Sequence, residues 1–195
     1  MAIREDIERL IKESIEVKQK LEIDAIAKAV ELFVDTLSSG GKILFCGNGG
    51  SAADAQHLAA ELVVRFKTNR IPYPALSLAV DPSVVTAAAN DYGYEHVFER
   101  QVQALGREGD LLVAISTSGR SANVNLAVDV AKLKGMRVIY MTGESMPLVA
   151  SKCDLVINVP SKNTARIQES HITIGHIIIE LVERELTEKW GKFKA

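Results

Sequence analysis

The fold is decided by residues 42–62, which read KILFCGNGGSAADAQHLAAEL. Four apolar residues, 43–46, lead directly into the glycine-rich loop 47–51 and then into a stretch with helical spacing. A short apolar run that ends in a glycine loop before a helix is typical of a strand-to-helix step in an open α/β sheet. We therefore expect a buried strand, a tight loop and a helix, in this order.

The same apolar pattern recurs along the chain. Short runs rich in β-branched and other apolar residues occupy 43–46, 75–80, 111–115, 137–141 and 155–159. Continuous apolar runs are typical of parallel strands that are buried on both faces. Helical patterns lie between or after them, at 51–66, 82–105 with a break near 90–93, 121–134, 146–151 and 164–190. This alternation predicts an α/β three-layer sandwich, with a five-stranded parallel sheet of flavodoxin-like order flanked by helices.

The first forty residues carry helical patterns and no strand pattern. Ile3, Ile7, Leu10, Val17 and Leu21 follow helical steps and form a narrow seam, which suits packing against another helix. Two interpretations stay open: the seam packs onto this chain's own sheet, or it forms a subunit interface in a helical bundle. We expect one domain over residues 1–195, with 1–40 as a helical extension for oligomerisation.

The composition favours an ordinary globular protein. Of 195 residues, 47% are hydrophobic and 25% charged, and the formal net charge is −2. This balance provides no basic field for nucleic acid, and no apolar run approaches the ~20 residues of a membrane helix. The acidic start lacks the order of a signal peptide, and the two cysteines suit buried thiols in a reducing compartment. We expect a cytoplasmic protein without nucleic-acid or membrane partners.

The loop at 47–52 has the chemistry of an anion site. Glycine lets the backbone approach a ligand closely, and the N-terminus of the following helix presents unpaired N–H groups. The spacing also satisfies the dinucleotide fingerprint G-x-G-x-x-A, but Asp81, the acidic residue after the second apolar run, lies too far along the chain for the ribose contact. The hydroxyl of Ser51 also has a purely structural role open to it, as the N-cap of the helix.

A second polar loop follows the third apolar run. Residues 116–121 read STSGRS, which places four hydroxyl groups and a glycine where a strand ends and a helix begins. Hydroxyl and backbone N–H groups together can bind several phosphate oxygens without a lysine. Helix capping would account for Ser118 or Ser121, but not for the whole cluster with Ser116 and Thr117. We expect a phosphate site here, beside the glycine loop if the first and third strands are neighbours.

Two helical segments carry acid–base side chains. His57 and Glu61 are four residues apart and therefore share one face of a helix. Gln168 and His176 lie in the last helical segment. A helical histidine is more often structural than catalytic, and the sequence pattern alone leaves this choice open.

At these positions the sequence is similar to the sugar isomerase (SIS) domain family, and within it most closely to the bacterial phosphoheptose isomerases. The similarity runs almost from end to end and is far more specific than either loop alone. It is carried by the stretches Cys46–Ser51, Asp54–Leu62, Ala89–Gly93, Gly106–Asp110, Ile115–Val124 and Arg166–His171.

The resemblance implies an aldose–ketose isomerase that converts sedoheptulose 7-phosphate to D-glycero-D-manno-heptose 7-phosphate through an enediol, in heptose biosynthesis for cell-surface glycans. It implies catalysis by Glu61 and His176, and one zinc ion per subunit held by His57, Glu61, Gln168 and His176. It also implies homotetramers with active sites at subunit interfaces. The residues that would bind the sugar phosphate are Asn48, Gly49, Gly50, Ser51, Asn90, Asp91, Ser116, Thr117, Ser118, Ser121 and Gln168.

The chemistry of these side chains agrees with that reaction. A carboxylate suits the removal of a carbon-bound proton, and an imidazole suits proton transfer between oxygens. Glu61 cannot easily be both a tight metal ligand and a free base, so the two roles alternate or the metal is not essential. Gln168 and His176 lie about 12 Å apart along an ideal helix at ~1.5 Å per residue, so we expect the metal site to take residues from two subunits.

Two other functions remain open. A non-catalytic SIS protein of the replication-initiator-associating type keeps the fold but lacks equivalents of Glu61 and His176, both of which are present here. Isomerisation of another phosphosugar is the second, because chain length and loops cannot count carbon atoms. The chain also carries Ala52 and Ala165 where some relatives have His and Asp, which affects ligand fit more than reaction type.

Overall fold

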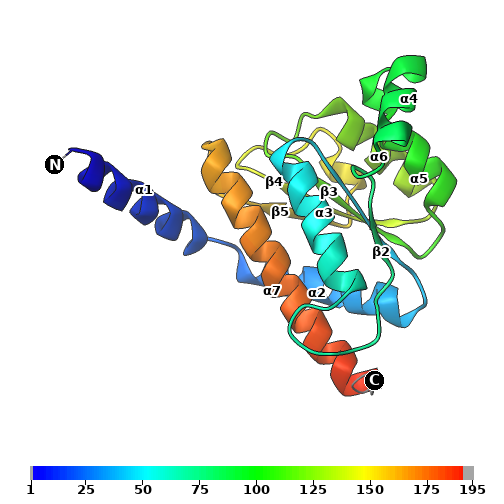
Figure 1. The fold of residues 1–195 in the computed structure, drawn as a ribbon, viewed down its shortest axis with the longest axis horizontal. Coiled ribbons are helices and arrows are strands. Elements are labelled where there is room, and N and C mark those ends of the chain that lie inside the picture. The colour runs from blue at the N-terminus through cyan, green and yellow to red at the C-terminus, as the bar shows by residue number, and fades with distance from the viewer. Residues whose placement is uncertain (1, 191–195) are drawn as a thin grey trace.

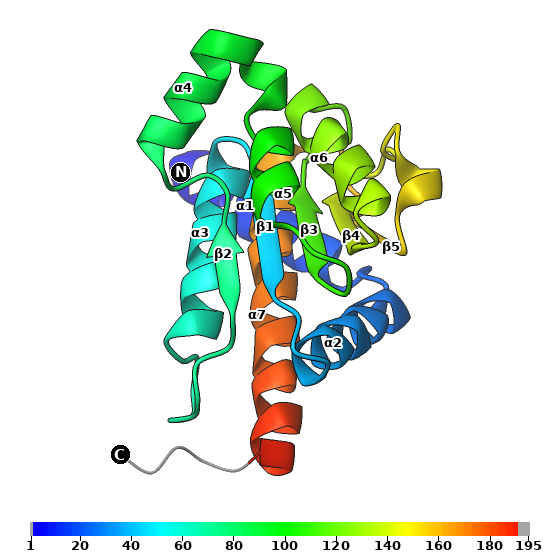
Figure 2. The same cartoon turned by 90° about the vertical axis from the view of Figure 1, so that its right-hand side faces the viewer.

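The computed structural model describes residues 2–190, and its centre is a sheet of five parallel strands. The flavodoxin-like strand order and the flanking helices confirm the predicted three-layer α/β architecture (Figure 1, Figure 2). Across the sheet the order is β2 (Ala75–Ser77), β1 (Ile43–Gly47), β3 (Leu111–Ile115), β4 (Arg137–Thr142) and β5 (Leu155–Asn158).

Seven α-helices and two short 3-10 turns complete the described part of the chain. The helices are α1 (Ala2–Lys18), α2 (Ile23–Ser38), α3 (Gly50–Val63), α4 (Pro82–Tyr92), α5 (Glu99–Leu105), α6 (Ala122–Leu133) and α7 (Thr164–Trp190). The 3-10 turns are η1 (Tyr94–His96) and η2 (Ala150–Lys152).

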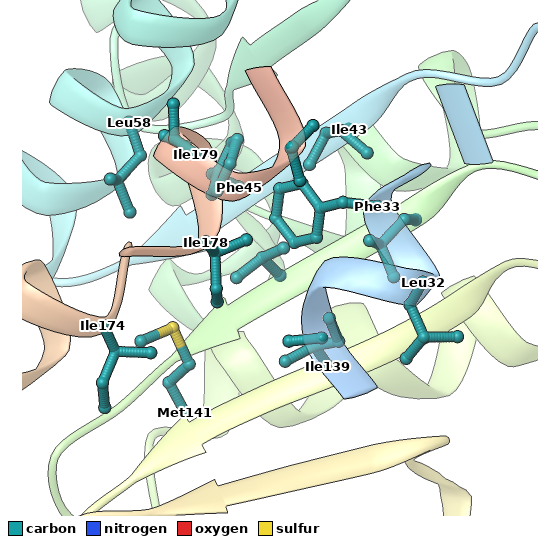
Figure 3. Packing of buried hydrophobic residues seen from close by; sticks show 14 of the residues in the cluster. Leu32, Phe33, Ile43, Phe45, Leu58, Ile139, Met141, Ile174, Ile178 and Ile179 are labelled. Atoms are coloured by element: carbon teal, nitrogen blue, oxygen red, sulfur yellow. The ribbon is translucent and has the colours of Figure 1, made fainter. Parts of the chain in front are cut away.

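The sheet separates two apolar layers, because successive side chains of a strand point to opposite faces. In β1, Ile43 and Phe45 belong to the layer formed with α2, α3 and α7, whereas Leu44 and Cys46 belong to the layer formed with α5 and α6. None of these four side chains is more than 1% exposed, so the strand is buried on both faces as its apolar run predicts. Figure 3 shows the first layer, in which Phe45 lies close to Phe33 of α2.

The two helices α3 and α7 pack side by side over one face of the sheet. Along α3, Gly50 approaches Gln168, and further on Leu58 approaches Gly175. Both contacts advance in the same direction along the two helices, so α3 and α7 run parallel. This packing decides which side chains of the two helices meet.

The first helix, α1, projects away from the rest of the molecule (Figure 1). None of its 17 described residues is buried, and Ile3 and Ile7 are 78% and 53% exposed. It contacts α7, where Nη1 of Arg166 donates to the carbonyl oxygen of Leu10 at 2.7 Å. Its last turn approaches the core through Val17. The interpretation in which the seam packs onto the chain's own sheet therefore fails for the exposed residues Ile3, Ile7 and Leu10. Val17 and Leu21, by contrast, do pack against the chain's own core.

Three predicted elements differ from the structure, the first being the helix expected over 51–66, which ends at Val63. The strand expected over 75–80 is limited to β2, because the chain turns away and Asp81 caps α4 by accepting the backbone N–H groups of Ser83 and Val84. The helix expected over 146–151 is replaced by the 3-10 turn η2; six residues that include Pro147 are too few to stabilise an α-helix. The break expected in 82–105 is confirmed at Gly93, whose φ is +97°.

Within residues 2–190, no helix combines the length and apolar character needed to cross a membrane.

Candidate active site

The glycine loop between β1 and α3 brings the backbone of α3 into close contact with α7. Gly49 has a φ of +54°, a conformation that favours glycine, and α3 begins at the next residue. A Cβ atom on Gly50 would lie 1.4 Å from Nε2 of Gln168. Ser51 is buried in the first turn and Gly49 holds the N-cap position, so the capping interpretation of Ser51 is wrong.

The hydroxyl loop between β3 and α6 presents a helix N-terminus to solvent. Ser121 occupies the N-cap position without a side-chain capping bond to any described residue. Its Oγ instead lies 2.9 Å from Oγ of Ser116. A pocket of about 270 Å³ opens beside the loop, and its lining includes Thr117, Ser118 and the cation Arg120. The residues Thr117 and Ser118 therefore border a space that can receive an anion, and the lining of this space also includes Arg120 and Glu144.

The two loops lie side by side, because β1 and β3 are neighbours and Gly47 pairs with Ile115 at their ends. The side chains of Asn48 and Asn123 exchange two hydrogen bonds of 2.8 Å, one from each Nδ2 to the other Oδ1. The hydroxyl of Tyr94 also donates to Oδ1 of Asn48, at 3.1 Å. The predicted juxtaposition of the loops is confirmed, and Asn48 is held in place by the second loop.

An imidazole–carboxylate cluster lies further along α3 and α7. Nε2 of His57 is 2.9 Å from Nε2 of His176, and 3.5 Å from Oε1 of Glu61. The ring of Phe66 stacks on His176 at 5.5 Å between centroids and 23° between planes. His57 remains 47% exposed, so the cluster is open to a ligand. The spacing of His57 and Glu61 predicted their common face, but the contact with His176 is a product of the α3–α7 packing.

The side chains in this cluster are of types that bind zinc, but they are not all arranged around one point. Two imidazole nitrogens and a carboxylate oxygen are common zinc ligands. Gln168, however, lies against Gly50, about two helical turns before His176. Among residues 2–190, no group of three or more His, Cys, Asp or Glu side chains is arranged to hold a metal ion. One described chain therefore brings three of the four expected ligands near one another and leaves Gln168 apart.

The expected sugar-binding pair Asn90 and Asp91 lies at the exposed C-terminal end of α4. Nδ2 of Asn90 donates to Oδ1 of Asp91 at 2.8 Å. Figure 2 shows α4 extending beyond the sheet. The link to the loops is Tyr94, which follows α4 and reaches Asn48.

Three titratable groups near the site have displaced pKa values. Burial raises the pKa of Asp54 on α3 to about 6, with a smaller opposing effect of His57. Burial lowers the pKa of His171 to about 4, although its hydrogen bond with the carbonyl oxygen of Thr142 opposes the shift. Burial also raises the pKa of the Cys46 thiol to about 12, which makes it unreactive and agrees with the expected buried thiol.

Sequence reasoning missed several residues that support the site. Asn123 lies inside a quoted stretch, but nothing in its spacing indicates a bond to Asn48, 75 positions earlier. Tyr94 and Phe66 carry aromatic rings outside any recognised pattern. Each of these contacts joins distant segments, so only the folded structure can show it.

Comparison with known proteins places the chain in a family. A family model described as "SIS domain" matches residues 7–143. The phosphoheptose isomerase of Roseiflexus sp. (strain RS-1) is 52% identical over 182 residues, which cover 92% of each chain. The chain belongs to the SIS domain family.

Solved structures agree with this assignment. A phosphoheptose isomerase from Neisseria gonorrhoeae matches with a TM-score of 0.88 and 45% identity, over 93% of this chain and 99% of the other. A phosphoheptose isomerase from Francisella tularensis matches with a TM-score of 0.89 and 38% identity, over 94% of this chain and 100% of the other. Within the SIS family the chain therefore groups with the phosphoheptose isomerases, and it is an enzyme of the isomerase class.

Proposed function

We propose that this chain converts sedoheptulose 7-phosphate to D-glycero-D-manno-heptose 7-phosphate through an enediol, in heptose biosynthesis for cell-surface glycans. The observation that carries the proposal is the cluster of His57, Glu61 and His176, which places a carboxylate beside two imidazoles. The similarity to phosphoheptose isomerases over most of the chain supports the choice of substrate.

The substrate phosphate binds to the hydroxyl loop in this proposal. Ser116, Thr117, Ser118 and Ser121 supply hydroxyl donors, and the N-terminus of α6 supplies backbone N–H groups. This arrangement needs no buried cation, which agrees with the near-neutral charge of the chain.

The sugar lies along the glycine loop and the edge of α7. Gly49 and Gly50 expose backbone to the substrate, and Gln168 lies against Gly50. Oδ1 of Asn48 already accepts from Asn123 and Tyr94, and Nδ2 already donates one N–H to Asn123. Asn48 therefore contacts the sugar through its backbone or the remaining N–H of Nδ2. Ser51, Asn90 and Asp91 complete the proposed sugar-binding set.

The reaction moves two protons. The carboxylate of Glu61 removes a proton from C1 of the ketose, and the electron pair forms the C1–C2 double bond of the enediol. The same carboxylate returns a proton to C2. His176 transfers a proton between the two oxygens, from O1 to O2, so that the carbonyl forms at C1. The net result is the aldose, with no atom gained or lost.

We further propose one zinc ion per subunit, with His57, Glu61, Gln168 and His176 as its ligands. When bound, zinc would stabilise negative charge on the substrate oxygens. Two imidazole nitrogens 2.9 Å apart support a shared cation, whereas the position of Gln168 requires its side chain to rotate or a second subunit to contribute it.

The working unit in this proposal is a homo-oligomer, a tetramer, whose sites combine residues of two subunits. About three helical turns separate Gly50 from Glu61, or about 16 Å at ~1.5 Å per residue, so the loops and the acid–base cluster of one chain lie far apart. The exposed apolar residues of α1 support an assembly role for residues 1–40. In this view residues 1–195 are one SIS domain.

We place the enzyme in the cytoplasm. Within the described residues Cys46 and Cys153 are both free, which suits a reducing compartment. Its partner is a small sugar phosphate, and neither nucleic acid nor a membrane is required.

The test is turnover of sedoheptulose 7-phosphate, followed by NMR through the appearance of the aldose. Glu61→Gln should lower kcat by at least about 100-fold and preserve substrate binding, because the base is lost and the shape is kept. Glu180→Gln, which changes an exposed carboxylate on α7, should keep wild-type turnover. Absence of turnover by the wild type, with and without added zinc, would contradict the proposed function.

A chelator and a substrate panel complete the test. If zinc is catalytic, removal by a chelator lowers kcat and added zinc restores it. Faster turnover of a pentose or hexose phosphate would assign the same chemistry to another substrate. Binding of the sugar phosphate without turnover would instead indicate a non-catalytic SIS protein.

A further inference from the structure

The segment between α3 and β2 is attached to α7 by two buried opposite charges. The side chain of Arg70 is 0% exposed, and that of Glu183 is 3% exposed. Charged side chains are almost never fully buried unless they are paired, and such a pair is costly to break. The Arg70–Glu183 pair lies outside the glycine loop, the hydroxyl loop and the acid–base cluster, so the proposed function does not explain it.

Glu183 binds the backbone of the segment that follows α3. Its Oε1 accepts the N–H groups of Lys67 at 2.8 Å and Thr68 at 2.6 Å. Its Oε2 accepts the N–H group of Phe66 at 2.9 Å and Nε of Arg70 at 3.1 Å. Burial raises the pKa of Glu183, but these donors outweigh it and hold the pKa below its usual value.

Arg70 binds the end of α3. Its Nη2 donates to the carbonyl oxygen of Glu61 at 2.8 Å, and its Nη1 donates to that of Leu62 at 2.8 Å. The last carbonyl groups of a helix have no hydrogen-bond partner within the helix, and Arg70 supplies a donor to two of these groups. The guanidinium also lies 3.8 Å from the ring centroid of Tyr73, which restricts its plane.

These contacts lead directly to the acid–base cluster. Arg70 holds the backbone of Glu61, the proposed base. Glu183 holds the backbone of Phe66, whose ring stacks on His176. Glu183 also lies about two turns beyond His176 on the same helix.

We propose that Arg70 and Glu183 are positioning residues for the isomerisation, which hold the end of α3 and Phe66 so that Glu61 and His57 face His176. The expected changes in kcat rest on the proposed function, whereas the positions of Glu61, His57 and His176 do not depend on it. A displacement of about 1 Å at a catalytic group can lower turnover on the order of 100-fold.

The kinetic test uses conservative substitutions of the pair. Arg70→Lys keeps the charge but loses the planar set of donors, and Glu183→Gln keeps the shape but loses the charge. We expect both variants to lower kcat about 10- to 100-fold, with KM changed by less than about threefold, under conditions in which circular dichroism shows full folding. The pH–rate profile should also shift, because the surroundings of Glu61 and His176 change.

The control is the exposed pair on the same two segments. Nζ of Lys67 lies 2.7 Å from Oε2 of Glu180, and both side chains are about half exposed. Glu180→Gln removes this contact between the segment and α7 without touching the buried pair. We expect wild-type kcat and pH profile, since exposed ion pairs contribute little.

A structural readout separates this inference from the proposed function. The ring of Phe66 should shift the NMR resonances of His176 through its ring current, and Glu183→Gln should change those shifts while Glu180→Gln leaves them unchanged. This readout needs no substrate, so it remains valid if the wild type does not turn over sedoheptulose 7-phosphate. Unchanged His57 and His176 resonances in both Arg70→Lys and Glu183→Gln would overturn the inference.

A double variant covers the case in which the single variants do not fold. Arg70→Met with Glu183→Leu replaces the buried charges by apolar side chains, an exchange that often preserves stability. We expect this variant to fold and to show the same displaced His176 resonances and lowered kcat. Wild-type kcat and wild-type resonances in the folded double variant would show that the pair only stabilises the fold, and would overturn the inference.

Discussion

Among single residues, Gly50 shows how closely α3 and α7 approach at the edge of the site. The space that a Cβ atom would need is filled by the end of the Gln168 side chain, while the φ of Gly50 is one that other residues adopt. The requirement for glycine here is therefore one of space. A substitution should move Gln168, whose side chain is flexible, and leave the helix intact.

We predict that Gly50→Ala lowers kcat at least about tenfold and leaves the free energy of unfolding unchanged, or raised by up to about 1 kcal/mol, because alanine favours a helix. Steady-state kinetics and urea unfolding measure the two effects. The control is Gln168→Ala: if Gly50→Ala acts by displacing Gln168, the double variant is no worse than the more damaged single variant. Additive losses would contradict this explanation.

The second residue with a measurable consequence is His171 on α7. It is fully buried, Nε2 bonds to the carbonyl oxygen of Thr142 at 3.1 Å, and Nδ1 has no partner among the described residues. Its pKa of about 4 in the folded chain compares with about 6.5 in an unfolded chain. Between these values the unfolded chain binds a proton that the folded chain does not, so the free energy of unfolding falls as the pH falls.

We predict that the titration of His171 lowers the free energy of unfolding by about 2 kcal/mol when the pH falls from 7.5 to 5, at about 1.4 kcal/mol per pKa unit. His171→Gln can still donate to Thr142 but does not titrate, so its unfolding free energy should fall less over this interval. Urea unfolding at fixed protein concentration measures the difference. Leu58→Ala, which destabilises the core without removing a titratable group, should retain the wild-type pH dependence. An equal pH dependence in His171→Gln and wild type would contradict the prediction.

At the level of elements, the strands and their order could be predicted from the sequence, whereas the elements against which each helix packs could not. A parallel strand buried on both faces must be apolar throughout, so each short apolar run in the sequence predicts a strand. The loops at 47–51 and 116–121 indicate the edge of the sheet where ligands bind. The bounds of α7 follow from its long helical pattern, and the structure confirms them.

The short elements and the distant contacts could not be predicted. The edge strand β2 is cut short by the cap that Asp81 gives to α4, and 146–151 is too short for helical spacing to identify a helix. The spacing of His57 and Glu61 is local and therefore visible, whereas their meeting with His176 depends on how α3 packs on α7.

That packing depends on Gly175. A Cβ atom there would lie 2.6 Å from a methyl carbon of Leu58, which is 2% exposed and borders a cavity of only about 10 Å³. We predict that Gly175→Ala lowers the free energy of unfolding by about 1–3 kcal/mol and lowers kcat as well, because it pushes α3 and His57 away from His176. Urea unfolding and steady-state kinetics measure the two effects.

The double variant with Leu58→Ala tests the cause. Leu58→Ala alone should cost about 2–5 kcal/mol through the cavity it leaves. Combined with Gly175→Ala, the added methyl group fills part of that cavity, so the total loss should be smaller than the sum. A total equal to or larger than the sum would show that Gly175 is required for another reason.

On the scale of the whole molecule, α1 is the element that the single chain does not explain. Ile3, Ile7 and Ile11 are 78%, 53% and 56% exposed on a helix that extends away from the body (Figure 1). Apolar residues gathered along an exposed helix mark an interaction surface. Fully burying one isoleucine contributes about 1.5–3 kcal/mol, so several of them supply a substantial part of an interface.

We predict that Ile7→Asp combined with Ile11→Asp dissociates the proposed homo-oligomer and leaves the chain folded, since no residue of α1 belongs to the buried core. Sedimentation velocity measures the mass, and circular dichroism and urea unfolding check the fold. If the site takes residues from two subunits, kcat falls with the assembly and recovers at high protein concentration. Glu8→Gln, an exposed change on the same helix, should keep the wild-type mass and activity. A double variant that dissociates but keeps full activity at every concentration would show that one chain holds a complete site.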